Sequence, residues 1–377
     1  MKWASMSAAA TSASKPKERV LVFRIGSLGD SCVALPAFRL IRQSYQDADI
    51  RVLTNFPIGQ GVKAAPLQTV IGQSGLVDGY FQYPIGLNSW NGFRHCVCEL
   101  FQWRPDVVIY LMPRRSVAQL GRDFMFFRWV LGIKKIKGLS FNRKAQKCMW
   151  DEQRQTFEKE ASRLIRNLDT LGSIDLSCKT TWDLGLKASE ITQVGNFLES
   201  WPGTKNFIVC AVGTKIDTKD WEQSRWEAWA KTLSNQYPDL GLLLIGVAVE
   251  LERSEHVSRH WRGPKLNLCG KLTPRESGAL LRQARCFVGH DSGPMHLAAA
   301  VGTPCVAVFS AQERPGIWFP YGGQHQVIYH KTECFGCRLE VCEKYQKECI
   351  RSITVEEVVQ ATKVLLSSSA PQAVISL

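Results

Sequence analysis

The sequence predicts an α/β protein with two Rossmann-like domains whose parallel sheets face a central cleft. Its 377 residues exceed what one ordinary hydrophobic core holds, which favours two domains. Short apolar runs alternate with amphipathic stretches, a pattern typical of parallel βαβ units. The alternation occurs once on each side of residues 176–205, which carry no strong strand pattern and are predicted to form an interdomain linker region.

The first domain is predicted to cover residues 19–175, after a disordered tail at residues 1–18. Its apolar runs predict strands at Val20–Ile25, Asp49–Thr54 and Pro105–Leu111. A helical pattern follows the first strand to about Tyr45, and Pro36 within it implies a kink or a helix that begins there.

The second domain is predicted to cover residues 206–353. Its apolar runs predict strands at Phe207–Val212, Gly241–Ile245, Cys286–Gly289 and Cys305–Phe309. Its helical patterns lie at Trp226–Gln236, Glu250–Trp261, Pro274–Ala284 and Pro294–Val301. Residues 354–377 contain a last helical pattern, Val355–Leu366, which could cross back to brace the first domain.

Composition narrows the class of protein. The chain is 45% hydrophobic and 21% charged, which excludes a disordered or collagen-like protein. No apolar run reaches the roughly 18 residues that a membrane span needs. The N-terminal residues lack the apolar core of a secretory signal, and the 13 cysteines are too dispersed in a chain of this size to suggest a disulfide scaffold. We therefore expect a reducing, cytoplasmic environment.

The net charge of +13 is unevenly placed and points to an anionic partner. Residues 1–175 hold 25 Lys and Arg against 14 Asp and Glu, whereas residues 176–377 hold 22 against 20. The first half is therefore where we expect the bulk charge to meet an anion.

The segment from Gly289 to Cys305 is predicted to form a strand, a tight turn, a helix and a second strand. Asp291 or Ser292 suits the N-cap of this helix, and Gly293 allows a ligand to approach the backbone closely. The amides at the start of the helix, beyond the carboxyl end of a parallel strand, then form a site for a phosphate. The alternative is a well-capped core helix in which His296 is satisfied by a neighbour.

Two further loops follow predicted first strands. Asp30, in Gly26-Ser-Leu-Gly-Asp30, is placed to accept a proton from a hydroxyl nucleophile, although the motif in isolation favours an ordinary helix N-cap. Thr214 and Lys219 follow the first strand of the second domain and suit a diphosphate. For Lys219 the alternative is a solvated loop lysine.

Two of these motifs together carry a family resemblance. Arg24-Ile-Gly-Ser-Leu-Gly-Asp30, followed by Leu35-Pro-Ala37, and the later Asp291-Ser-Gly-Pro-Met-His296 with Val301-Gly-Thr-Pro304 resemble the heptosyltransferase family of glycosyltransferases, family 9. Trp318–Gly322 and His325 resemble the segment that follows the second motif in that family. The resemblance covers the chain from about Arg19 to Leu366.

The resemblance implies the GT-B fold and an inverting transfer of heptose from ADP-heptose to the inner core of lipopolysaccharide. It implies that Asp30 is the general base. The donor-binding residues that it implies are Thr214, Lys219, Glu250 or Glu252, Asp291, Ser292, Gly293, Met295 and His296. No metal is expected for catalysis, because a helix N-terminus and a lysine can hold the diphosphate charge. The apolar segment after Gly246 departs from the family pattern and leaves the adenine specificity open.

A basic stretch in the first half is the candidate for the acceptor or membrane surface. Ten basic residues and one acid lie between Arg114 and Lys147, with aromatic residues among them. The residues chosen for this surface are Arg114, Arg115, Lys134, Lys135 and Lys137. Such a stretch fits an anionic membrane or a phosphorylated acceptor. The alternative is a solvated helix that packs its aromatic face on the core, and no nucleic-acid motif appears.

Four cysteines near the C-terminus form a second compact group, Cys334, Cys337, Cys342 and Cys349. Cys-x2-Cys spacing and four thiolates suit a structural zinc or iron–sulfur site. Their uneven spacing leaves reduced thiols or a disulfide as alternatives.

We therefore expect an inverting, metal-independent glycosyltransferase at the cytoplasmic face of the inner membrane, as a peripheral protein. Its partners would be a nucleotide-sugar donor and an anionic lipid-linked or lipopolysaccharide acceptor, with no nucleic acid. A nucleotide-sugar epimerase of the same fold and a non-catalytic assembly protein are the alternatives.

Overall fold

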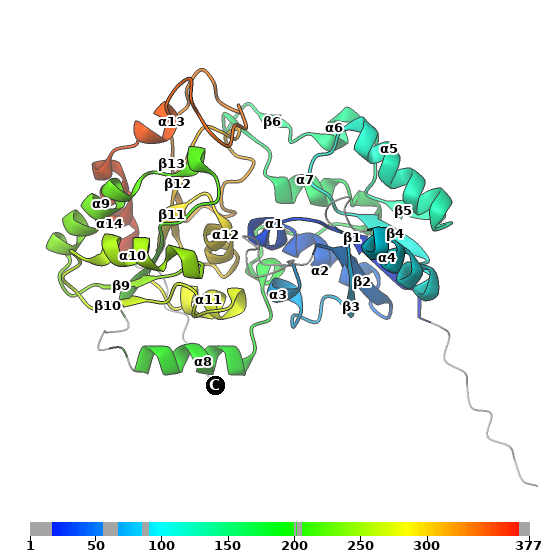
Figure 1. Cartoon of the computed structure of the whole chain (residues 1–377), viewed down its shortest axis with the longest axis horizontal. Helices are drawn as coiled ribbons and strands as arrows, with labels where there is room; N and C mark the ends of the chain where they lie inside the picture. The colour runs from blue at the N-terminus through cyan, green and yellow to red at the C-terminus, as the bar shows by residue number, and fades with distance from the viewer. Residues whose placement is uncertain (1–16, 56–66, 85–89, 200, 202–205, 369–377) are drawn as a thin grey trace, which may run out of the picture.

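The computed structural model describes residues 17–55, 67–84, 90–199, 201 and 206–368, which form two parallel sheets flanked by helices (Figure 1). The first sheet contains β1 (Arg19–Phe23), β2 (Asp49–Thr54), β3 (Gly79–Gln82), β4 (Val107–Tyr110) and β5 (Lys135–Lys137). The second contains β8 (Phe207–Ala211), β9 (Gly241–Leu244), β10 (Lys265–Asn267), β11 (Phe287–His290), β12 (Cys305–Phe309) and β13 (Gln326–Tyr329). The predicted fold class is confirmed.

The strand orders are those of two doubly wound sheets. The first has the order β3-β2-β1-β4-β5 and the second the order β10-β9-β8-β11-β12-β13. Every ladder within these two sheets is parallel. Apart from Arg19 at the start of β1, the central strands are apolar and fully buried, as expected of strands covered by helices on both faces. A small antiparallel pair, β6 (Trp150–Asp151) and β7 (Thr156–Phe157), stands apart from both.

Helices connect the strands of each sheet. Those of the first half are α1 (Leu28–Val33), α2 (Leu35–Ser44), α3 (Leu67–Ile71), α4 (Trp90–Trp103), α5 (Val117–Met125), the π-helix η1 (Phe126–Val130), α6 (Arg143–Gln146), α7 (Glu160–Arg166) and η2 (Asp169–Leu171). The linker region holds η3 (Lys179–Trp182) and α8 (Ala188–Glu199). Those of the second half are η4 (Asp217–Lys219), α9 (Gln223–Gln236), η5 (Ala248–Glu250), α10 (Leu251–Ser258), α11 (Pro274–Leu281), α12 (Gly293–Ala300), α13 (Glu348–Arg351) and α14 (Val355–Ser367).

Pro36 separates two helices, as its position in the sequence predicts. α1 ends at Val33, and α2 begins at Leu35 with Pro36 in its first turn, where a missing N–H costs nothing. This break leaves α1 as a short helix directly after the first strand, at the carboxyl edge of the first sheet.

The C-terminal helix corrects an expectation. α14 packs against α9, β12 and β13, so its described residues brace the second sheet and do not cross to the first. Val358, Val359 and Leu365 of α14 join the buried cluster that contains Trp226 and Trp229 of α9. The apolar side of α14 is thus buried against the second domain, which precedes it in the chain.

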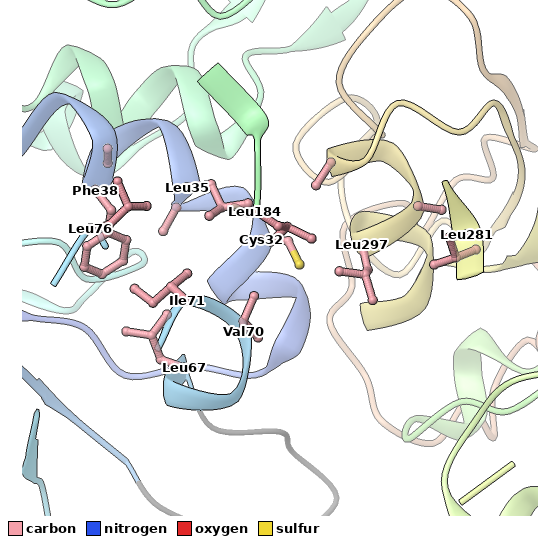
Figure 2. Close-up of a cluster of buried hydrophobic side chains, with 14 of the residues drawn as sticks. Cys32, Leu35, Phe38, Leu67, Val70, Ile71, Leu76, Leu184, Leu281 and Leu297 are labelled. Atoms are coloured by element: carbon pink, nitrogen blue, oxygen red, sulfur yellow. The ribbon is translucent and has the colours of Figure 1, made fainter. Parts of the chain in front are cut away.

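One buried apolar cluster spans both halves of the molecule. Figure 2 shows Cys32 of α1, Val70 of α3 and Leu184 of the linker region on one side, and Leu281 and Leu297 of the second half on the other. The same cluster extends under β1 and under β11. The two sheets therefore share a core where α1, α3, α11 and α12 meet.

Buried Arg275 of α11 links the same region by hydrogen bonds. Its guanidinium donates to the carbonyl of Val70 at 2.8 Å, to that of Leu184 at 2.9 Å and to the Glu190 carboxylate at 2.6 Å. Because the arginine is almost completely buried, these partners are needed to compensate its desolvation.

Candidate functional site

Loops at the carboxyl edge of the second sheet gather most of the predicted donor residues. β8, β9 and β11 are neighbours in the sheet, and the loops that follow them carry Thr214, Glu250 and Asp291 respectively. Half-buried Thr214 accepts a bond from the amide of Ile216 at 3.4 Å. Parallel strands bring their carboxyl ends to one edge, where open α/β sheets bind ligands.

Lys219 and Asp291 form an ion pair at this edge. Lys219 Nζ lies 2.6 Å from Asp291 Oδ2, and His296 Nε2 lies 3.7 Å from Asp291 Oδ1. Burial alone would raise the pKa of Asp291, but Lys219 and His296 outweigh it and lower that pKa to about 2. Burial would likewise lower the pKa of Lys219, yet the Asp291 carboxylate leads the charges that raise it above its ordinary value. The lysine therefore remains a cation, and the solvated-lysine alternative is wrong.

Glu250 faces the site and Glu252 does not. The side chain of Glu250 lies over Gly213 and Gly246, where a Cβ on either glycine would collide with it, and its Oε2 accepts from the amide of Val247 at 3.0 Å. Burial raises the pKa of Glu250. Glu252 is 90% exposed and pairs with His256. Of the two carboxylates that the sequence left open, Glu250 is the one beside the donor loops.

Asp30 is both a helix cap and a carboxylate at the interface of the two halves. Its Oδ2 accepts from Ser27 N at 2.8 Å and from Ser27 Oγ at 2.9 Å. Its Oδ1 lies 3.7 Å from Arg24 Nη2, and the Arg24 guanidinium is held by the Leu111 carbonyl at 2.7 Å. Ser27 is the N-cap of α1 and Asp30 is the third residue of the helix, so the N-cap alternative is wrong for Asp30. Asp30 instead completes a capping box with Ser27, which fixes the orientation of its carboxylate.

The carboxylate of Asp30 and the ammonium of Lys219 interact across the interface. Asp30 is among the charges that raise the pKa of Lys219, after burial, which lowers it, and after Asp291 and Glu313, which raise it. The site thus combines a base candidate from the first half with a cation from the second.

α1 and α12 meet through two glycines. A Cβ at Gly29 would lie 2.9 Å from His296 Cδ2, and a Cβ at Gly293 would lie 2.8 Å from Leu28 Cβ. Leu28 therefore covers the N-terminus of α12, where the sequence predicts a phosphate. Ser292 is the N-cap, but its side chain makes no capping bond, and the amide of Met295 donates to the Ser292 carbonyl at 3.1 Å.

A pocket remains between the two halves beside this contact. It is lined by Cys32 and Val33 of α1, by Lys159 before α7, by His296 of α12 and by Tyr321. Lys159 Nζ donates to the Pro320 carbonyl at 2.5 Å, and burial lowers its pKa to about 8. Where the two halves touch, the space between them is therefore a pocket and not the open cleft that the sequence predicts.

Glu313 is a site residue that the sequence analysis missed. It follows β12 at the same sheet edge and contributes to the raised pKa of Lys219. Its Oε2 is buried without a hydrogen-bond partner among the described residues. The available signal was its position just after a buried strand, which is where the other donor residues were found.

The basic residues predicted as one surface are divided by the structure. Arg114 and Arg115 lie in the loop beyond the carboxyl end of β4. Burial is the main cause that lowers the pKa of Arg24, and the charge of nearby Arg115 also lowers it. Lys135 instead pairs in register with Val107, the first residue of β4, and its Nζ lies 3.7 Å from Glu18. Lys135 thus lies at the start of edge strand β5, away from Arg114 and Arg115, whereas Lys137, paired with Ile109, ends β5 at the same carboxyl edge as their loop.

The four C-terminal cysteines line one pocket as free thiols. Cys334, Cys337, Cys342 and Cys349 share it with Thr218 and Gln312. Their segment also covers the Lys219 loop, because Thr218 donates its amide to Glu340 and its hydroxyl to Leu339. No group of three or more His, Cys, Asp or Glu side chains in the described part of the chain is arranged to hold a metal ion. A bound metal stays a prediction.

Across the residues that the structure describes, the helices are too short or too polar to cross a membrane.

Comparison with known proteins identifies the relatives of this arrangement. The family model described as glycosyltransferase family 9 (heptosyltransferase) matches residues 126–347. Lipopolysaccharide heptosyltransferase 3 of Escherichia coli K12 is 35% identical over 118 residues, which are 29% of this chain and 31% of that protein. The match therefore spans about a third of that relative.

Solved structures agree over nearly the whole fold. The glycosyl transferase family 9 protein of Veillonella parvula superposes with a TM-score of 0.69 at 18% identity, covering 94% of this chain and 99% of that one. The E. coli ADP-heptose lps heptosyltransferase II superposes with a TM-score of 0.64 at 17% identity, covering 92% and 98%. The GT-B arrangement of two Rossmann-like halves is confirmed.

Proposed function

Because the chain belongs to glycosyltransferase family 9, we propose that it transfers a sugar from a nucleotide-sugar donor to a saccharide acceptor with inversion. Heptose and ADP-heptose are the proposed sugar and donor, on the model of the relatives named above. Family membership favours transfer over the epimerase and over the non-catalytic alternative.

The observation that carries the proposal is that Asp30 of the first half lies close enough to Lys219 of the second half for its charge to raise the pKa of the lysine. Ser27 holds Oδ2 of Asp30, and Oδ1, 3.7 Å from Arg24 Nη2, is the proposed proton acceptor. Lys219, fixed by Asp291, would hold the negative charge of the leaving diphosphate. A base and a leaving-group cation from opposite domains are what a displacement at the sugar carbon requires.

The proposed reaction uses these groups in one step. Asp30 takes the proton of the acceptor hydroxyl, and that oxygen attacks the anomeric carbon opposite the diphosphate. The bond from that carbon to the diphosphate breaks, and the diphosphate leaves toward Lys219 and the amides of Ser292 and Gly293. Glu250, over Gly213 and Gly246, is placed to accept hydrogen bonds from the ribose.

Replacing the proposed base tests the assignment. Asp30→Asn keeps the shape of the side chain but removes the proton acceptor, so turnover should fall roughly 10²–10⁴-fold. ADP should still raise the melting temperature, since the donor residues lie in the second half. Asp47→Asn, at an exposed carboxylate between α2 and β2, is the matched control and should keep full turnover. Normal turnover of Asp30→Asn would remove Asp30 from the mechanism.

A nucleotide panel tests the donor site itself. A ligand present at 100 times its Kd stabilises the folded state by about 2.7 kcal/mol, enough to measure as a thermal shift. We expect ADP to stabilise the protein more than UDP or GDP does. If none of the three nucleotides shifts the melting temperature, the proposed donor site is wrong.

We also propose an anionic, lipid-linked or lipopolysaccharide-type acceptor and a peripheral position at the cytoplasmic face of the inner membrane. The +13 net charge, concentrated in the first half, supports an anionic partner there. Arg114 and Arg115 lie at the edge of the first sheet nearest the site and are the proposed acceptor contacts.

A structural metal at the cysteine pocket remains a proposal. Four thiols line one pocket, which is the observation that supports this proposal. Burial raises the pKa of Cys349, and a hydrogen bond from the Ala311 backbone offsets this only in part. A bound metal would fasten the segment that covers Thr218. Elemental analysis of the purified protein decides between a metal and free thiols.

A further inference from the structure

The first half exposes an apolar surface that the catalytic site does not use. Trp90 of α4 is 73% exposed and Trp129 of η1 is 70% exposed. Further exposed apolar side chains of this region are Phe93, Met125, Val130 and Phe141. We call these six residues the aromatic face. Large exposed apolar patches are uncommon on soluble monomers and mark interaction sites.

Ring contacts join the aromatic side chains of this region into two groups, each of which includes a residue of η1. Phe93 of α4 lies 6.0 Å from Phe126 of η1, between ring centroids. Phe124 of α5 lies 6.4 Å from Trp129 and 6.0 Å from Phe141. These ring contacts connect α4 to η1, and connect α5 and η1 to the loop before α6.

The two tryptophans are exposed, whereas other side chains of the same elements are buried in the core of the first half. Leu100 of α4 and Leu120 of α5 are buried, and Phe127 of η1 packs on Phe23 of β1 at 5.3 Å. Each of these helices already has a core-facing side, so the exposed aromatics are not needed to attach them. The alternative that the aromatic side chains between Arg114 and Lys147 pack on the core holds for buried Phe127 and is wrong for Trp129.

The charge around the aromatic face is positive. Arg94 of α4 and Arg143 and Lys144 of α6 are exposed. The one acid between Arg114 and Lys147 is Asp123, which is buried and receives a 2.7 Å hydrogen bond from Tyr110. On α4 the partly exposed carboxylate is Glu99, which lies 3.6 Å from His95. Between residues 114 and 147 the face therefore offers cations without an exposed carboxylate.

We propose that the aromatic face docks this protein on a bilayer that contains anionic lipid. Tryptophan and phenylalanine enter the interfacial layer, and the flanking arginines and lysine meet the lipid phosphates. A second copy of the chain fits less well, because two basic faces would repel each other. This inference rests on the proposed function only in that a lipid-linked acceptor gives the docking its purpose.

The placement of the face suits that purpose. α5 begins two residues after Arg115, which lies in the loop at the carboxyl edge of the first sheet. A bilayer held by α4, α5 and η1 therefore adjoins the loop proposed to contact the acceptor.

Vesicle co-sedimentation of the full chain tests the docking surface. The vesicles are phosphatidylcholine with or without phosphatidylglycerol. The wild type should sediment with the mixed vesicles and lose binding as salt rises. Trp90→Ser with Trp129→Ser should weaken binding at least tenfold. Arg94→Gln, Arg143→Gln and Lys144→Gln together should weaken it roughly a hundredfold, since each cation near an anionic surface contributes about fivefold.

Matched variants on the second half control for general loss of charge or apolar area. Val364→Ser replaces an exposed apolar residue of α14, and Lys231→Gln, Lys271→Gln and Arg282→Gln remove three exposed cations. Both controls should sediment like the wild type. Equal loss in the control set and the arginine–lysine set would overturn the proposal, because binding would then follow net charge alone.

Two further outcomes would overturn it. If the variant with both tryptophans replaced still binds the vesicles, the docking surface lies elsewhere on the protein. A wild-type dimer in light scattering that this change converts to a monomer would make the face an interface between copies. ADP thermal shifts, measured on the same variants, keep the two proposals separable. A lost shift with normal sedimentation would contradict only the donor site.

Discussion

At the scale of the residue, Asp291 holds the donor half of the site together. It pairs with Lys219 at 2.6 Å and lies 3.7 Å from His296, and all three side chains are largely buried. Removing one partner of such a pair leaves the other as an unpaired buried charge, which is more costly than the pair is stabilising. Asp291 therefore serves stability as well as the proposed binding of the donor.

The lowered pKa of Asp291 predicts a pH dependence. In the folded state that pKa is about 2, against an ordinary value of 3.8. The unfolded chain thus binds the proton first as pH falls, and the stabilisation by ionised Asp291 is present above about pH 4 and lost toward pH 2. In urea unfolding, Asp291→Asn should be less stable than the wild type at pH 6, by on the order of 2 kcal/mol. The gap should narrow between pH 4 and 2. A gap that stays constant would contradict the assignment.

Some residues of the candidate site could be predicted from the sequence and others could not. Asp30, Lys219 and Asp291 were found because each follows a predicted strand and carries the right chemistry. Glu250 could not be separated from Glu252, because only the turn of η5 directs one of them over Gly213. Lys135 was grouped with Arg114 by closeness in the chain, whereas edge strand β5 places it beside Val107, at the opposite end of β4 from the loop that holds Arg114.

At the scale of the element, the contact of α1 with α12 depends on two residues without side chains. Gly29 admits His296, and Gly293 admits Leu28. Because each helix brings a glycine to the other, the approach is closer than ordinary side chains permit. Both glycines lie in motifs that the sequence analysis singled out, yet their shared role is visible only when the two helices are seen together.

Filling the space at Gly293 should therefore loosen the interface. The methyl group of Gly293→Ala would lie 2.8 Å from Leu28 Cβ, and overpacking of this kind costs roughly 1–3 kcal/mol. Gly195→Ala in α8 is the control, because nothing lies within 4 Å of its new Cβ and alanine favours a helix. Thermal unfolding measures both. Leu28→Gly removes the obstructing atom, so the double variant should lose less than the sum of the single losses.

The strands were predicted most accurately where their sequences are continuously apolar. β12 was predicted to the residue, and β8 and β9 to within one residue, because their buried runs are continuous. β3, β5, β10 and β13 were missed. They lie toward the margins of the two sheets, and their partly exposed residues give a weak hydrophobic pattern.

At the scale of the whole molecule, the shared apolar cluster makes the two halves depend on each other. Cys32 and Val70 of the first half and Leu297 of the second belong to one buried cluster (Figure 2). Arg275 adds hydrogen bonds to Val70, Leu184 and Glu190. Separating the halves would expose this cluster and leave Arg275 without its partners.

We expect the protein to unfold in one cooperative transition despite its two sheets. Far-ultraviolet circular dichroism follows both halves, and tryptophan fluorescence is weighted to the second half by fully buried Trp221, Trp226 and Trp229. The two signals should change at the same temperature. Two separated transitions would show that the shared cluster contributes little to joining the halves. Arg275→Met should lower the common transition, since it strands Glu190.

The contact of Leu28 with Gly293 also has a kinetic consequence. Because Leu28 lies against Gly293, we expect the proposed diphosphate to reach the N-terminus of α12 only after α1 withdraws, a movement that would also carry Asp30 away from the donor. Water that enters with the donor therefore finds no base beside the anomeric carbon. We expect the donor to bind first and to be hydrolysed slowly without acceptor, because the base returns only when closure has excluded bulk water.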